Sequence, residues 1–215
     1  MVADYRLMSH GAEFPSGGED IALAVEWINK NKIGEKADLF IMGNSAGGVH
    51  LTTFLLHSDF AETRRKVTAG QGTRLRGAVL LSVPFSFHIA HESRAEVLKK
   101  YFGDYDANSP LGLLKTAREH APFDFVKGGT RVFVLNGELD PEDEILLPRD
   151  LFVKEWLEMG DNESRGALAV DWMTGHNHIS PFASLSTGLE SDEAWGYQVA
   201  GFCDNIRKFA PHEST

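Results

Sequence analysis

The stretch DLFIMGNSAGG, residues Asp38–Gly48, decides how the rest of this chain is interpreted. It begins with a short apolar run, places Ser45 between Gly43 and Gly47, and continues into an amphipathic helical pattern over Val49–His57. This order predicts a strand, a tight turn and a helix, with a hydroxyl group at the turn. We expect glycines on both sides of the serine because a side chain at either position would block the close approach of strand and helix.

A Gly-x-Ser-x-Gly motif between a strand and a helix is typical of the turn that presents a nucleophilic serine, the nucleophile elbow. The serine lies in a strained conformation, and backbone N–H groups at the start of the helix face the charge that develops in acyl transfer. The alternative is a glycine-rich phosphate-binding turn. It is disfavoured because no lysine follows the glycines and the chain has no Gly-x-Gly-x-x-Gly motif.

Composition and charge limit the class of protein. With 215 residues the chain can bury a sizeable core, and we expect residues 1–215 to form a single domain. Its net charge of −10 disfavours nucleic acids and anionic membranes as main partners. No apolar run approaches the ~18–20 residues of a membrane span, and the first residues lack the apolar segment of a signal peptide. The single cysteine, Cys203, suits a reducing compartment, so a cytoplasmic location is expected.

Short apolar runs alternate with helical patterns along the chain, which predicts an α/β fold with a mostly parallel sheet flanked by helices. The segment 84–122 has helical spacing without a strand pattern and is expected to be a helical cap inserted into the domain. A polar surface connection is expected at 60–73. The expected strands are 2–7, 37–44, 75–83, 130–136 and 167–172, and the expected helices are 21–31, 49–57, 95–102, 142–159 (interrupted by Pro148) and 193–209.

Side chains able to act together follow three of these strands: Ser45, Asp140, and the pair His176 and His178. In open parallel sheets the reactive groups lie at the carboxyl ends of the strands. A serine becomes nucleophilic when a histidine, held by a carboxylate, takes its proton. The chain order Ser, Asp, His therefore indicates a catalytic triad.

Each triad residue has an alternative. Asp140 precedes a proline and would also suit a plain turn. Two histidines at i and i+2 suit metal binding, but no third ligand of obvious spacing accompanies them, so we expect neither a metal nor another cofactor. The other carboxylates near Asp140 are Glu138, Asp143 and Asp150. The other histidines are interpreted as surface or cap residues: His10, His50, His57, His88, His91, His120 and His212.

These segments resemble the hormone-sensitive-lipase-like carboxylesterases of the α/β-hydrolase superfamily. The resemblance implies that fold and esterase activity, with Ser45 as nucleophile, Asp140 orienting the base and no cofactor. Asn44 stands where the family usually has an aspartate that supports the turn. The matching segments, in chain order, are DYRL (Asp4–Leu7), Phe14-Pro15 with Glu19-Asp20, GNSAGG (Gly43–Gly48) and GELDP (Gly137–Pro141).

The histidine loop departs from that family. There, the catalytic histidine is usually followed by a glycine and an aromatic residue, whereas this chain reads GHNHISP over Gly175–Pro181. The loop is similar to the Gly-x-x-His loop of formamidase-like and methylesterase-like hydrolases, in which the later histidine matches the base. This resemblance favours His178 over His176.

A second departure concerns the start of the chain. The family's His-Gly-Gly-Gly segment, which supplies half of the oxyanion hole, precedes the strand that matches residues 2–7, and His10-Gly11 follows it and is no substitute. The backbone N–H of Ala46 is then the remaining donor, and losing one donor typically costs ~10²–10³-fold in rate. We therefore hypothesise an N-terminally truncated hydrolase, whether a gene-model fragment, a short isoform or a degenerate copy.

The same departure affects the sheet. The family's third strand would be missing beside the elbow strand, so either a gap opens there or residues 2–7 move into the vacancy. An unpaired edge at this place favours self-association.

Together these features predict a serine carboxylester hydrolase for a small, moderately apolar ester. Phe85, Phe87 and the Tyr101-Phe102 pair would cover the acyl pocket or form the core of the cap. Two alternatives stay open. A non-catalytic relative that binds a small molecule or a partner would fit the missing oxyanion segment but not the complete triad. An amide or formamide hydrolase would use the same triad.

Overall fold

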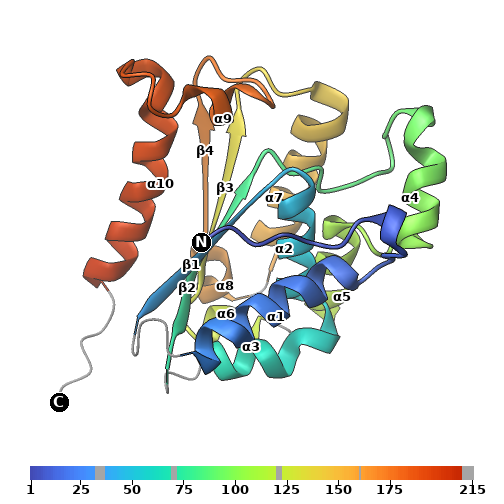
Figure 1. Ribbon diagram of the computed structural model, residues 1–215, viewed down its shortest axis with the longest axis horizontal. Coiled ribbons are helices and arrows are strands. Elements are labelled where there is room, and N and C mark those ends of the chain that lie inside the picture. The colour runs from blue at the N-terminus through green and yellow to red at the C-terminus, as the bar shows by residue number, and fades with distance from the viewer. Residues whose placement is uncertain (32–36, 69–71, 120–122, 160, 210–215) are drawn as a thin grey trace.

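The computed structural model describes residues 1–31, 37–68, 72–119, 123–159 and 161–209. In this part of the chain four parallel strands form one sheet in the order β1-β2-β3-β4 (Figure 1). All strands therefore present their carboxyl ends at the same edge, and the predicted α/β fold with a parallel sheet flanked by helices is confirmed. The strands are β1 Asp38–Asn44, β2 Arg74–Leu81, β3 Arg131–Gly137 and β4 Leu168–Met173.

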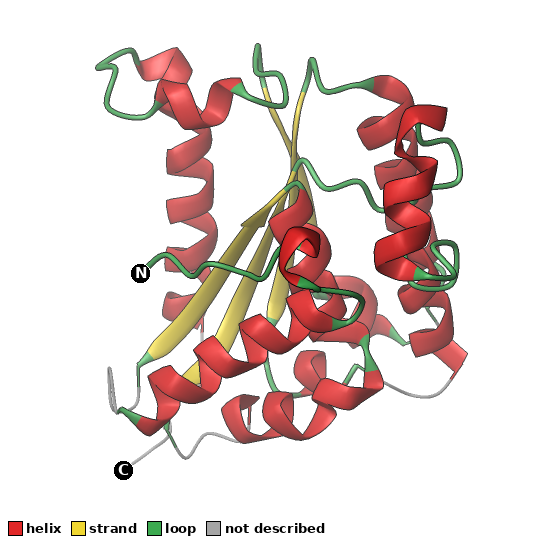
Figure 2. Ribbon diagram, turned by 45° about the vertical axis from the view of Figure 1, so that its right-hand side comes forward, coloured by secondary structure: helices red, strands yellow, loops and turns green. Residues whose placement is uncertain are grey.

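Different helices cover the two faces of the sheet (Figure 2). On one face, Leu81 and Leu135 cluster with Trp195 of α10 (Glu190–Phe209). On the other face, Leu80 and its neighbours form the larger core cluster. Because side chains alternate along a strand, β2 is buried on both faces. The helices that contribute to the larger cluster include α1 Ser16–Lys30, α2 Ala46–Leu56, α3 Ala61–Thr68, α5 Pro110–Glu119 and α7 Leu147–Leu157.

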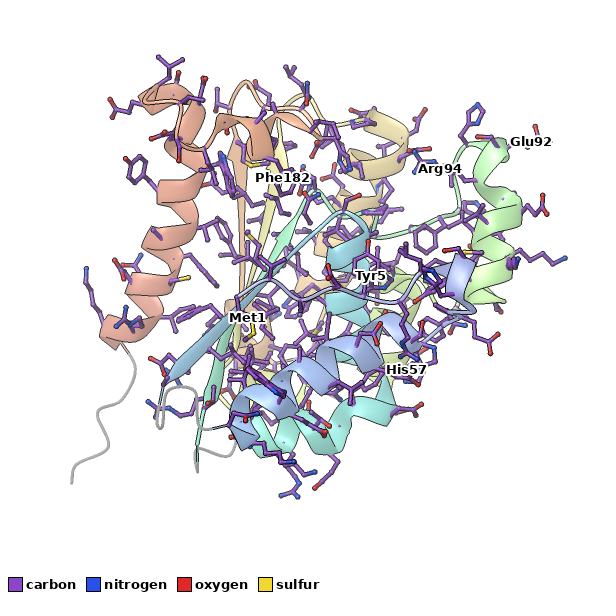
Figure 3. The ribbon with its side chains drawn as sticks, viewed as in Figure 1. Met1, Tyr5, His57, Glu92, Arg94 and Phe182 are labelled. Carbon is purple, nitrogen blue, oxygen red and sulfur yellow. The ribbon has the colours of Figure 1, made fainter. Side chains whose placement is uncertain are left out.

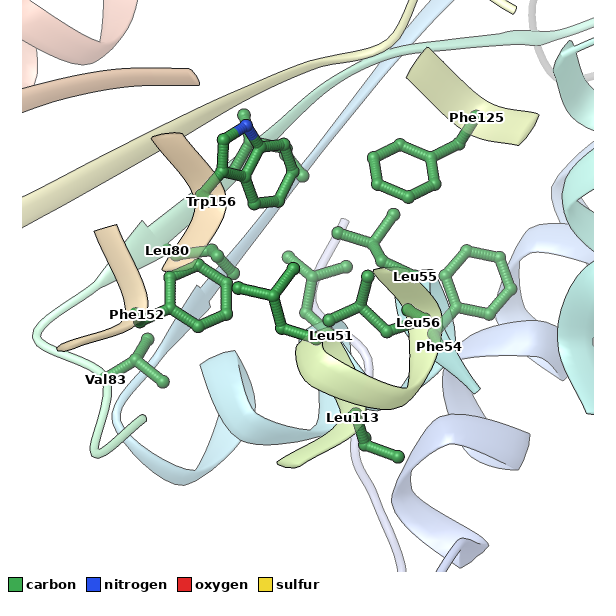
Figure 4. Packing of buried hydrophobic residues seen from close by; sticks show 14 of the residues in the cluster. Leu51, Phe54, Leu55, Leu56, Leu80, Val83, Leu113, Phe125, Phe152 and Trp156 are labelled. Atoms are coloured by element: carbon green, nitrogen blue, oxygen red, sulfur yellow. The ribbon is translucent and has the colours of Figure 1, made fainter. Parts of the chain in front are cut away.

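Helix α2 lies at the centre of the larger cluster (Figure 4). Its residues from Gly48 to Leu56 are all buried, and Leu51 and Phe54 pack in the same cluster as Phe152 and Trp156 of α7. The expectation of an amphipathic helix was wrong here, because a helix that is apolar all round lies inside the protein.

Residues 1–7 do not join the sheet, contrary to the predicted strand at 2–7. Side-chain contacts hold this segment on the helices instead. The Arg6 guanidinium binds Glu19 and Asp20 at 2.7 Å each, and the Tyr5 ring packs edge-on against His50 with 4.5 Å between ring centroids. Figure 3 shows Tyr5 beside α2. In the described residues β1 pairs only with β2, so its outer edge is unpaired; self-association there stays a prediction.

The expected surface connection at 60–73 is mostly helical, and residues 69–71 lie outside the described part. A 3₁₀ turn over Ser58–Phe60 leads into α3. Arg64 of α3 is buried because its guanidinium donates to the carbonyl oxygens of Phe54 and His57 at 2.7 and 2.8 Å and pairs with Asp124 at 3.1 Å. It thereby satisfies carbonyl groups at the end of α2.

Pro148 does not interrupt a helix; it lies in the first turn of α7, where its missing N–H is tolerated. A π-helical turn, η4 (Glu142–Leu146), precedes it. Across the described ranges, no helix combines the length and apolarity needed to span a bilayer. The remaining helices are η1 Met8–His10, η3 Glu92–Arg94, α4 Ala95–Phe102, α6 Asp124–Lys127, α8 Asn162–Gly166 and α9 Ser180–Ser184.

Candidate active site

Ser45 occupies the turn between β1 and α2 with φ 49° and ψ −119°, a conformation that residues with a side chain rarely adopt. Its N–H donates to the Leu81 carbonyl of β2 at 2.9 Å. Its own carbonyl accepts from the N–H groups of Gly48 and Val49 at 3.0 and 3.1 Å. These three bonds stabilise the strained turn, and Ser45 lines a cavity at the carboxyl edge of the sheet.

The glycines of the elbow differ in their packing. A Cβ atom on Gly43 would lie 2.5 Å from the carbonyl oxygen of Gly47, and one on Gly48 would lie 2.1 Å from Val83. A Cβ atom on Gly47 would meet nothing within 4 Å. The prediction that close packing requires both flanking glycines is therefore right for Gly43 and wrong for Gly47. Gly48 is the second tight position.

The structure brings Ser45, His178 and Asp140 together. His178 Nε2 lies 2.9 Å from Ser45 Oγ, and His178 Nδ1 lies 3.7 Å from Asp140 Oδ1. Nδ1 and Oδ1 are shielded from solvent and have no hydrogen-bond partner among the described residues. Each is therefore available to the other.

The second oxygen of Asp140 is held by neighbouring donors. Asp140 Oδ2 accepts from Ser82 Oγ at 2.7 Å, from the Gly137 N–H at 2.9 Å and from Asn136 Nδ2 at 3.4 Å. Ser82 directly follows β2 and has a φ of 46°. Sequence reasoning missed Ser82, since nothing in its local pattern shows that it meets Asp140. These donors orient the carboxylate so that Oδ1 faces His178.

His176 contacts different groups from His178. It is buried, its Nδ1 lies 3.0 Å from Ser180 Oγ, and its carbonyl accepts from the Leu139 N–H at 2.8 Å. It thus joins the loop after β4 to the loop after β3. The alternative carboxylates have other surroundings: Glu138 accepts from the Gly175 N–H, Asp150 pairs with Arg149, and Asp143 is exposed.

The cavity beside Ser45 has a volume of about 350 Å³. One wall comes from residues 5–8, one from α2 with Ala46, Val49 and His50, and one from residues between 84 and 102. Three of the four aromatic residues expected at the pocket line it: Phe87, Tyr101 and Phe102. Phe85 is instead a core residue, stacked on Phe152 at 4.2 Å.

Helix α4, which forms part of the cavity wall, is attached to α1 at Tyr101. The Tyr101 hydroxyl accepts from the Gly17 N–H at 3.1 Å, and the Tyr101 carbonyl accepts from the Phe14 N–H at 2.7 Å. At the other end, Arg94 forms an exposed ion pair with Glu144 at 3.0 Å. The role of the 84–122 segment as a cap stays a prediction, and its residues 120–122 lie outside the described part.

Three backbone N–H groups, those of Ala46, His10 and Gly11, are relevant to the oxyanion hole. Ala46 is the first residue of α2, where a backbone N–H has no acceptor within the helix. The N–H groups of His10 and Gly11 donate to the carbonyls of Leu7 and Met8 at 2.8 and 3.0 Å, so they are already used within the η1 turn.

His50 was expected at the surface or in the cap, and that expectation was wrong. It is only 8% exposed and lies on α2 between the rings of Tyr5 and Tyr101, with centroid distances of 4.5 and 5.9 Å. Burial lowers the pKa of His50 to about 4, although the nearby Asp20 carboxylate acts in the opposite direction. The apolar residues on either side of His50 in the sequence could have indicated that it is buried. His57, by contrast, is half-buried, His10, His88 and His91 are exposed, and His120 and His212 lie outside the described residues.

This pKa predicts a pH-dependent stability. The folded protein binds fewer protons at His50 than the unfolded chain between pH 4 and pH 6.5, so stability rises with pH in that window and is lost as the pH falls. Between pH 7 and 4.5 the loss from His50 is about 2 kcal/mol. Urea unfolding of wild type and His50→Leu at both pH values measures it. Equal losses in the two proteins would contradict the assignment.

Several solved structures with a similar fold are esterases. The carboxylesterase Cest-2923 from Lactobacillus plantarum aligns with a TM-score of 0.65 at 12% identity, over 97% of this chain and 74% of that chain. A thermophilic esterase from Thermogutta terrifontis aligns with a TM-score of 0.59 at 15% identity, over 99% of this chain and 72% of that chain. This chain has the α/β-hydrolase fold.

Part of a puromycin-hydrolyzing peptidase from Mycobacterium tuberculosis also has a similar fold. It aligns with a TM-score of 0.57 at 15% identity, over 90% of this chain but 25% of that chain. No protein-family profile matches the sequence, and no curated protein matches it. At these identities the similarity concerns the α/β-hydrolase fold alone.

Proposed function

We propose that this protein is a serine hydrolase that cleaves small, moderately apolar carboxylic esters. The observation that carries the proposal is the 2.9 Å contact between Ser45 Oγ and His178 Nε2, made by a serine in a strained turn. The buried carboxylate of Asp140 lies on the other side of the same imidazole ring. A nucleophile, its base and an orienting group are the parts that acyl transfer requires.

In the proposed mechanism Ser45 Oγ attacks the ester carbonyl carbon while His178 Nε2 takes the hydroxyl proton. Asp140 Oδ1 stabilises the imidazolium that forms. The Ala46 N–H stabilises the oxyanion. As the tetrahedral intermediate collapses, His178 gives its proton to the leaving alcohol, and an acyl-serine remains. Water, activated by His178, then hydrolyses this intermediate and restores the Ser45 hydroxyl.

The cavity supports the proposed substrate size. A volume of about 350 Å³ with mostly apolar lining suits a short acyl chain better than a long or charged one. The similar Thermogutta esterase is described with propionate bound, which supports a short acyl group here. In this proposal the 84–122 segment covers the acyl group, with Phe87 and Phe102 in contact with it.

Amide hydrolysis is the second candidate, and the similarity to the puromycin-hydrolyzing peptidase favours it. The same triad would then protonate a leaving amine. Comparing a p-nitrophenyl ester with the p-nitroanilide of the same acyl group separates the two. A higher kcat/KM on the anilide than on the ester would favour amide hydrolysis.

A fluorophosphonate probe tests the proposal directly, since it labels activated serines without a chosen substrate. We expect folded wild type to be labelled and Ser45→Ala to lose labelling completely. Ser93→Ala is the matched control, because Ser93 lines the same cavity, and it should be labelled like wild type. Folded wild type that resists labelling would count against the hydrolase and favour a non-catalytic binder.

A further inference from the structure

His50 is a polar side chain in the cavity wall that the proposed mechanism does not use. It lies more than nine-tenths buried, and no donor or acceptor among the described residues hydrogen-bonds to either ring nitrogen. Neither ring nitrogen is among the fully shielded side-chain atoms that lack a partner. The ring of this cavity-lining residue therefore keeps hydrogen-bonding capacity that the described residues do not use.

The orientation of the ring is defined by its neighbours. A Cβ atom on Gly17 of α1 would lie 2.0 Å from His50 Nδ1, so the Nδ1 edge of the ring faces α1. The opposite edge carries Nε2 and is turned away from α1. Because His50 lines the same cavity as Ser45, we infer that Nε2 is the atom presented to that cavity.

The charge of the imidazole restricts the ligand. The Asp20 carboxylate acts on His50 but is itself paired with the Arg6 guanidinium at 2.7 Å, and the rings of Tyr5 and Tyr101 pack against the imidazole. The imidazole is neutral at physiological pH, so it can either donate or accept one hydrogen bond at Nε2. A hydroxyl group can do both, whereas the neutral ring supplies no counter-charge for a carboxylate.

We propose that His50 selects esters whose acyl chain carries a hydroxyl group near the carbonyl. The inference rests on the proposed ester hydrolase function. Ser45 and His50 line the same cavity, and His50 lies on α2 five residues after the serine. A hydroxyl group close to the acyl carbonyl, as on C3 of a short acyl chain, is the position that we expect His50 to contact.

The test compares p-nitrophenyl 3-hydroxybutyrate with p-nitrophenyl butyrate, which differ only in the hydroxyl group. We expect wild type to prefer the hydroxyester in kcat/KM by about tenfold, the value of one net hydrogen bond. His50→Leu should bring the ratio close to one. Tyr5→Phe, which removes a hydroxyl from the same wall, should keep the wild-type ratio. Equal ratios in wild type and His50→Leu would overturn the inference.

A binding measurement separates this inference from the proposed hydrolase function. In the Ser45→Ala variant labelled with ¹⁵N-histidine, methyl 3-hydroxybutyrate should shift the His50 ring signals, and methyl butyrate should leave them in place. A shift without turnover in wild type would support His50 and reject the hydrolase. Turnover without a shift or a hydroxyester preference would reject His50 and leave the hydrolase standing. If neither turnover by wild type nor a shift of the His50 signals were observed, both the hydrolase function and the role of His50 would be rejected.

Discussion

Replacing His178 with asparagine is expected to lower kcat on a short p-nitrophenyl ester by about 10⁴-fold to 10⁶-fold. The variant loses the proposed base, whose Nε2 lies 2.9 Å from Ser45 Oγ. His176→Asn is the matched control, two residues away in the same loop. We expect it to lower kcat by less than about tenfold, because the His176 ring contacts Ser180 and an asparagine can reach the same hydroxyl.

Steady-state kinetics on both variants, with thermal unfolding as the folding control, checks this expectation. His176 joins two loops, so a lower melting temperature is the expected effect of its replacement. The opposite pattern, with His176→Asn inactive and His178→Asn active while both stay folded, would transfer the role of base to His176.

Asp140→Asn is expected to lower kcat by about 10⁴-fold. The donors from Ser82 and Gly137 at the Oδ2 position would hold the amide oxygen of the asparagine there. The amide nitrogen would then face His178 Nδ1 and donate to it, which places the ring proton on Nε2. In that tautomer the histidine cannot accept the proton of Ser45.

The control for this variant is Asp143→Asn, which removes an exposed carboxylate three residues away and should change kcat by less than about twofold. Measuring kcat across the pH range for both variants gives the comparison. A loss below tenfold in Asp140→Asn would show that this carboxylate does not orient the base.

Local sequence patterns were sufficient to predict most of the strands and helices of the fold. The elbow from Asp38 to Gly48 contains its own strand, turn and helix start, so its geometry followed from adjacent residues. The order of Ser45, Asp140 and His178 could be predicted as a set, because each follows a strand and parallel strands end at one edge. The structure brings these three side chains together, and their roles stay a proposal.

The features that could not be predicted from the sequence depend on tertiary contacts. Residues 2–7 have a strand-like pattern, yet the ion pairs of Arg6 hold them on α1. Arg64 belongs to the segment 60–73, which was expected to be a surface connection, but two carbonyl groups and Asp124 accept its hydrogen bonds inside the protein. Ser82 meets Asp140 only because β2 and β3 are neighbours in the sheet. A single sequence gives no information about such contacts between residues far apart in the chain.

The two ends of α4 are fastened unequally. At Tyr101, the side chain is bound to Gly17 in the first turn of α1 and the backbone carbonyl to Phe14, two residues before the helix. At Arg94, the attachment is an ion pair between an exposed guanidinium and the half-buried Glu144, of a kind that contributes about 0–1 kcal/mol and weakens with salt. High salt should therefore weaken the contact at Arg94 and leave the contacts at Tyr101, so the N-terminal end of α4 is the less firmly held part of the cavity wall.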